Sequence, residues 1–219
     1  MRYFFSQKLL LSIVSFTLLL QSVLAQKSGD WIFKSEKDGV KVYYRKTSDV
    51  HEIKMLTTMK ATLSGAVQLL NEVDNYPVWG YKISEAKLLQ QVNEREFYYY
   101  SKLDFPWPLS DRDIVVHSKM EQDSTTKKIT STGHAKPSRI PEQKGVVRIK
   151  TTTTKWTITP GTSGQINIEY YIHSNPGGNI PDWLVNMAID MGPRETLNGM
   201  RKILQQPKYQ AAKLAYIKD

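Results

Sequence analysis

Hydrophobic and polar residues alternate with a two-residue period over much of the chain, which is typical of half-buried strands. In one stretch Val40, Val42 and Tyr44 fall on one face. The pattern predicts strands at residues 39–45, 52–61, 85–92, 96–104, 112–122, 128–136, 145–159 and 165–173. Turn-forming residues at 123–125 and 160–161 separate several of these runs, which favours an antiparallel meander.

Two other stretches have helical spacing. Residues 64–72 predict a short amphipathic helix, and apolar residues recur at helical intervals from Trp183 to Leu204. Pro181 suits the first turn of the later helix, and Pro193 should kink its middle. We expect one α+β domain in which this last helix alone covers the apolar face of a single sheet.

Residues 1–25 differ from the rest of the chain. A basic start, an apolar run of about a dozen residues and small residues before Ala25 are typical of a secretory signal, and the run is shorter than the roughly 20 residues that span a bilayer. We expect cleavage after Ala25 and export of residues 26–219, as one domain, to the periplasm or the medium.

Composition excludes several kinds of chemistry. The chain has no cysteine, so disulfides, zinc–thiolate sites and a cysteine nucleophile are ruled out. The four histidines show no metal-ligand spacing, and no phosphate-binding glycine loop is present, so no cofactor or metal is expected. The net charge of +9 favours anionic partners such as lipid headgroups, and nucleic acid is not expected as a partner after export.

Three motifs occur in order along the chain. They are Pro-Trp-Pro-Leu-Ser-Asp-Arg-Asp at 106–113, Pro-Glu-Gln-Lys-Gly-Val-Val-Arg at 141–148, and Gly-Gly-Asn-Ile-Pro-Asp-Trp-Leu-Val-Asn at 177–186. With these motifs the chain resembles the START family of lipid-transfer domains, part of the helix-grip superfamily. The resemblance implies a strongly curved antiparallel sheet wrapped around the C-terminal helix, two short helices inserted early, and an apolar tunnel. It also implies a monomer that holds one lipid or sterol-like molecule without a cofactor.

Within this resemblance, Arg112 matches an arginine that can address the ligand's polar group at the inner end of the tunnel. A buried guanidinium must be paired, so a carboxylate or hydroxyl partner is expected, and Asp104 and Glu96 are near in sequence. An ordinary ion pair outside the tunnel is the alternative. The other expected tunnel residues are Tyr99, Val116, Met187, Met191 and Met200. For the three methionines, plain core is an equal alternative.

Two loops are expected to form the lips of the tunnel. Their residues are Phe105, Trp107 and Leu109 in the first loop, and Ile180, Trp183 and Leu184 in the second. Indole rings favour the membrane–water interface, and Trp107 lies between two prolines, so Trp107 is the main candidate for transient membrane contact. Packing of Trp107 onto the last helix, and of Ile180, Trp183 and Leu184 against the sheet, are the alternatives.

These expectations lead to a non-catalytic protein that binds and transfers one hydrophobic ligand, gated by the loops and the last helix. Helix-grip relatives also include cyclases and aromatases of polyketides, so an enzyme with Tyr99, His117 or Arg112 as its titratable group is the alternative. An enzyme would need several polar groups aimed into the tunnel. A solid core without a ligand is a third possibility.

Overall fold

The computed structural model describes residues 30–46, 51–178 and 180–219, without the side chains of residues 46, 51, 182 and 185–190. The predicted signal segment, residues 1–25, lies outside the described residues. Residues 31–219 group as one unit, and every contact below belongs to this unit.

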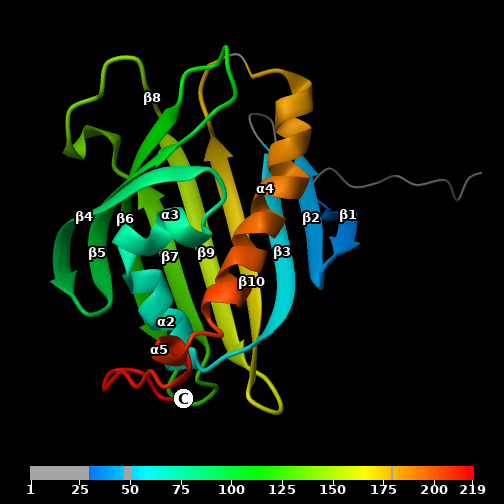
Figure 1. The fold of residues 1–219 in the computed structure, drawn as a ribbon, viewed down its shortest axis with the longest axis vertical. Coiled ribbons are helices and arrows are strands. Elements are labelled where there is room, and N and C mark those ends of the chain that lie inside the picture. The colour runs from blue at the N-terminus through cyan, green and yellow to red at the C-terminus, as the bar shows by residue number, and fades with distance from the viewer. Residues whose placement is uncertain (1–29, 47–50, 179) are drawn as a thin grey trace, which may run out of the picture. The chain divides into compact units, whose positions relative to one another are not determined.

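A ten-stranded curved sheet forms the framework (Figure 1). Its strands are β1 (Ile32–Lys37), β2 (Val40–Lys46), β3 (His51–Lys60), β4 (Ile83–Asn93), β5 (Glu96–Leu103), β6 (Arg112–Gln122), β7 (Ile129–Ala135), β8 (Val147–Arg148), β9 (Thr151–Pro160) and β10 (Gln165–Asn175). The order is β1-β2-β3-β10-β9-β7-β6-β5-β4, with every neighbouring pair antiparallel and the short β8 parallel to β6. The predicted α+β fold with a curved antiparallel sheet is confirmed.

The prediction of one strand over residues 145–159 is wrong. The strand is interrupted between β8, which ends at Arg148, and β9, which begins at Thr151. Arg148 is buried against the outer face of the sheet. Its guanidinium donates two hydrogen bonds to the carboxylate of Asp113 at 2.7 and 3.0 Å, and further bonds to the carbonyls of Pro137, Ile140 and Pro141. This pair fastens the β7–β9 connection to the outer face of the sheet.

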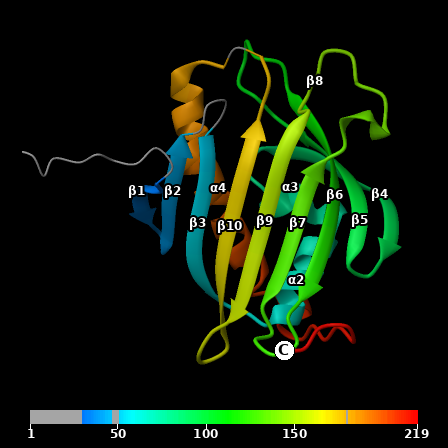
Figure 2. The same ribbon diagram turned by 180° about the vertical axis from the view of Figure 1, so that it is seen from behind.

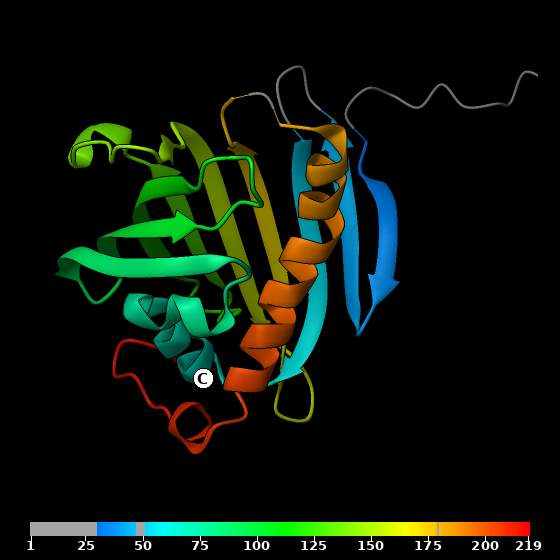
Figure 3. The same cartoon turned by 45° about the horizontal axis from the view of Figure 1, so that its top comes forward.

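The helices lie on one face of the sheet, which we call the inner face. They are α2 (Leu63–Asn71), α3 (Tyr76–Trp79), α4 (Asp182–Ile203) and α5 (Pro207–Gln210), with the 3-10 turn η1 (Val73–Asn75) between α2 and α3. A second 3-10 turn, η2 (Pro137–Arg139), belongs to the β7–β9 connection. Figure 2 shows the outer face with the helices behind the strands. The expectation that the last helix alone covers the sheet is wrong, because α2 and α3 cover the part beside the C-terminal end of α4 (Figure 3). The helix α4 continues through Pro193.

Helix α2 is held at its first turn from two directions. The hydroxyl of Thr62 accepts a hydrogen bond from the Gly65 N–H at 2.9 Å, which satisfies one of the free donors of the helix start. The Asp219 carboxylate accepts two more, from the Ser64 N–H at 2.8 Å and the Ser64 hydroxyl at 2.6 Å. These bonds tie the C-terminal segment to α2.

The inner face has two halves that differ in packing. In the lower half, beneath α2, α3 and the end of α4, the side chains are buried: Val40, Val42, Met55, Met59, Trp156, Ile158, Ile166 and Ile168. In the upper half, toward the β5–β6 and β10–α4 connections, five side chains are only half-buried, whereas Ile114, Val116 and Thr152 are buried. The half-buried side chains are Ile53, Tyr99, Thr154, Tyr170 and Ile172. Ile53, Ile172 and Thr154 form one cross-strand row.

Candidate functional site

Arg112 joins the two loops that the sequence predicts as lips. It begins β6 and is only 3% exposed. Its guanidinium donates hydrogen bonds to the carbonyl of Ser110 on one loop and to the carbonyls of Pro176 at 3.4 Å and Gly177 at 3.2 Å on the other. The Phe105 ring lies 4.2 Å from the guanidinium carbon. We call these contacts the Arg112 clasp.

The prediction that a carboxylate or hydroxyl pairs with Arg112 is wrong, because main-chain carbonyls accept its hydrogen bonds instead. Burial lowers the pKa of Arg112, and the nearby Asp111 carboxylate partly offsets this effect. Asp111 itself pairs with Lys102 at 3.0 Å and accepts a bond from the Phe105 N–H at 3.1 Å. Glu96, one of the two suggested partners, pairs with His117 instead. The guanidinium is therefore held by dipoles of the two loops rather than by a counter-ion.

The lip residues differ in exposure. Trp107 is 91% exposed and Trp183 is 57% exposed, whereas Leu184 is 4% exposed. Phe105, Leu109 and Ile180 are half-buried. In this structure Trp107 does not pack onto the last helix, and Leu184 packs inward. The assignment of all six as lip residues stays a prediction.

The predicted tunnel residues are only partly brought together. Tyr99 on β5 and Val116 on β6 are cross-strand partners. Arg112 lies on the same face of β6, nearer to the β5–β6 connection. Met200 is fully buried in the lower half, and Met191 is 37% exposed on α4. The side chain of Met187 lies outside the described residues. Tyr99, Val116 and Arg112 therefore belong to the upper half, and Met200 does not.

An aromatic cluster that the sequence analysis missed lies between the sheet and α3. Its members are Tyr76, Trp79, Tyr99, Trp156 and Tyr170, which we call the aromatic ring. Successive ring centroids lie 5.4 Å apart for Tyr99–Tyr76, 5.2 Å for Tyr76–Trp79, 6.4 Å for Trp79–Trp156 and 3.7 Å for Trp156–Tyr170. Burial raises the pKa of Tyr99, and it raises that of Tyr170 together with a smaller effect of Tyr99. The spacing of Tyr76 and Trp79 on one turn was the available sequence signal.

Three of the four histidines lie in one row on the outer face. Cross-strand pairing runs from Glu52 through His173, Thr153 and His134 to His117. His117 stacks on Tyr98 at 4.3 Å and lies away from the inner face. Within residues 30–46, 51–178 and 180–219, no group of three or more histidine, aspartate or glutamate side chains is placed to hold a metal ion.

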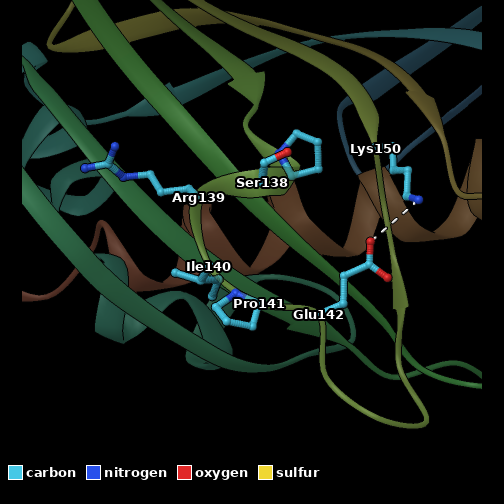
Figure 4. Close-up of a pocket in the computed structure, with 7 residues that line it drawn as sticks. Ser138, Arg139, Ile140, Pro141, Glu142 and Lys150 are labelled. Carbon is cyan, nitrogen blue, oxygen red and sulfur yellow. Dashed lines mark ion pairs between the residues drawn. The ribbon is translucent and has the colours of Figure 1, made fainter.

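A surface hollow of about 440 Å³ lies on the β7–β9 connection. Figure 4 shows its lining, where the Glu142 carboxylate and the Lys150 ammonium face each other at 3.5 Å. It is an exposed site outside the predicted lips, lined by both charged and apolar side chains. Among the described helices, none has the length and apolar character needed to cross a bilayer.

Comparisons with known proteins agree with the fold. The START domain family model matches residues 16–210. An uncharacterized protein of Pseudomonas aeruginosa, PA1579, is 32% identical over 81% of this chain and 88% of its own length. The phosphatidylcholine transfer protein of Mus musculus is 27% identical over 83% of this chain and 86% of its own.

One solved structure is similar in both sequence and fold. The STAR-related lipid transfer protein from Xanthomonas axonopodis has a TM-score of 0.74 and 31% identity, over 80% of this chain and 99% of that one. The named relatives are lipid transfer proteins, and together they support lipid binding or transfer as the general function.

Proposed function

The chain belongs to the START domain family, and on that premise we propose that it binds one lipid between the upper half of the inner face and α4, and transfers it. The proposal takes the general function from the family and assigns the place of binding from the packing. The ligand is held without covalent chemistry. Hydrophobic burial supplies its affinity, at about 25 cal/mol per Å² of apolar surface.

The half-buried state of Ile53, Tyr170 and Ile172 in the upper half is the observation that carries this proposal. Protein interiors are packed as densely as organic crystals, so apolar side chains facing a covering helix are normally buried. Ile53, Tyr170 and Ile172 are not, although the neighbouring Met55 and Ile168 are almost fully buried. A row of partly exposed apolar side chains beneath a helix is the arrangement that an apolar ligand would complete.

The Arg112 clasp supports a gate at the loop end of this site. Opening the loops requires the guanidinium to leave the carbonyls of Pro176 and Gly177. We propose that this happens at a membrane, where the exposed indoles of Trp107 and Trp183 enter the interface. We further propose that residues 1–25 direct export, so that the donor and acceptor membranes would face the exported compartment.

The experiment extracts lipid from the gently purified protein and identifies it by mass spectrometry. We expect about one lipid per chain in the wild type. Thr154→Phe should reduce bound lipid several-fold because it fills the upper half, whereas Thr153→Phe, on the outer face, should not. If the wild type carries no lipid and binds no apolar probe such as pyrene, or if both variants retain equal lipid, the proposed site is wrong.

A further inference from the structure

The aromatic ring contains polar atoms that have no hydrogen-bond partner among the residues that the structure describes. Trp79 is 6% exposed, and its indole N–H is buried without a hydrogen-bond acceptor. A buried donor without an acceptor costs about 1–3 kcal/mol, so native proteins rarely leave one unpaired. The indole is fixed by Tyr76 on one side and Trp156 on the other.

Three tyrosine hydroxyls belong to the same cluster, and one of them is bonded within the protein. Tyr76 donates its hydroxyl to the Leu70 carbonyl and is satisfied. Tyr99 and Tyr170 are half-buried, and neither hydroxyl takes part in a hydrogen bond within the described residues. The ring thus presents one donor and two groups that both donate and accept, at the boundary between the packed lower half and the half-buried upper half.

We propose that the aromatic ring is a binding site for a neutral oxygen group of the lipid, such as a carbonyl or hydroxyl, held by Trp79, Tyr99 and Tyr170. This inference rests on the proposed function and adds a chemical requirement to it. The unpaired indole N–H needs an acceptor, which a hydrocarbon chain does not have. A cationic group would leave that N–H unpaired, although it would be attracted to the ring faces. The preferred ligand therefore has an oxygen at its deeply bound end.

The site differs from the Arg112 clasp in position and chemistry. Arg112 lies at the loop end, is positively charged, and is already bonded to three carbonyls. The aromatic ring involves α3 and is built from neutral groups. A lipid with one polar group at each end could engage both sites at once.

The test uses two neutral probes with equal numbers of heavy atoms, methyl decyl ketone and tridecane, each measured by displacement of bound pyrene. Trp79→Phe keeps an aromatic side chain at this position but removes the indole N–H. We expect it to weaken ketone binding about five-fold and to leave tridecane binding unchanged. Tyr99→Phe and Tyr170→Phe should act in the same direction. Tyr76→Phe, whose hydroxyl is already bonded within the protein, is the matched control and should not change the ratio of the two affinities.

Several outcomes would overturn the inference. One is an equal effect of Trp79→Phe on the affinities for ketone and alkane, which would show that the cluster only packs against the ligand and does not bind its oxygen. Another is stronger binding of decyltrimethylammonium than of the ketone, lost on Trp79→Phe, which would make it a cation site. Failure of pyrene and both probes to bind the wild type would instead reject the proposed function. If Trp79→Phe does not fold, the Tyr99 and Tyr170 variants decide, because both side chains are half-buried.

Discussion

The two halves of α4 differ although they belong to one continuous helix. After Pro193, Leu197 and Met200 are fully buried against α2, α3 and the lower half of the sheet. Before Pro193, Trp183 and Met191 are substantially exposed. The first half is the more apolar of the two, with seven apolar residues among 182–192 against three among 194–203, so composition does not explain the difference. The second half has helices packed beside it, and the first half does not.

The contact of Gly199 with α3 shows how closely the second half is packed. A β-carbon at Gly199 would lie 2.4 Å from the carbonyl oxygen of Trp79, a distance that real side chains do not adopt. Only glycine allows α4 to approach α3 this closely. At Gly192, between the two halves, the nearest atom would be 3.2 Å away and belongs to the side chain of Tyr81. The second half of the helix is therefore fixed in the core by its contact with α3, and the contact at Gly192 is with a side chain rather than with backbone.

The largest expected effect is on stability, and it comes from making the same Met→Ala substitution in each half of α4. Met200→Ala removes a fully buried side chain and should lower the free energy of unfolding by roughly 2–5 kcal/mol. Met191→Ala removes a side chain that is 37% exposed and should change it by no more than about 0.5 kcal/mol. Urea denaturation of both variants measures the difference. Equal losses would show that the first half is packed as tightly as the second.

The sequence predicted the local elements well because their signals are local. The alternation over residues 112–122 predicts β6 with its observed bounds, and the apolar spacing over 64–72 predicts α2 to within one residue. Burial on α4 could not be predicted in this way. Met191 and Met200 both fit the helical pattern, but their burial depends on whether α2 and α3 pack beside them.

The candidate site depended even more on contacts between distant residues. The carbonyl partners Pro176 and Gly177 are 64 and 65 residues from Arg112, and main-chain carbonyls leave no signature in a sequence. The aromatic ring combines residues of α3, β5, β9 and β10. Proximity of this kind follows from the strand order, which the local pattern does not contain.

The second prediction concerns the Arg112 clasp, whose loss should free the first half of α4. Arg112→Met keeps much of the side-chain volume but loses the hydrogen bonds that join the two loops, and it leaves no unpaired charge. We expect exchange of bound pyrene with neutral vesicles to become about ten-fold faster. Arg112→Lys retains the charge without the planar fork and should be intermediate.

The opposite result would give Arg112 a different role. If exchange of pyrene is unchanged and Arg112→Met weakens only lipids with an anionic headgroup, Arg112 binds the ligand, as the sequence resemblance implied. In that case the two loops are held together by other contacts, and the difference between the halves of α4 does not depend on the clasp.

The smallest expected effect concerns the membrane surface beside the first half. Trp107 is 91% exposed, and its ring can enter an interface without contact to the bound ligand. We expect Trp107→Ala to weaken binding to anionic liposomes about five-fold, equivalent to about 1 kcal/mol, because part of one indole loses its burial. Its affinity for pyrene should stay unchanged.

Phe33→Ala is the control, since Phe33 is 54% exposed on the edge strand β1, outside the lips. Liposome co-sedimentation measures both variants. An equal loss of liposome binding in both variants would indicate that membrane contact is distributed over the surface. A loss of pyrene affinity in Trp107→Ala would place the indole in the binding site instead of at the membrane.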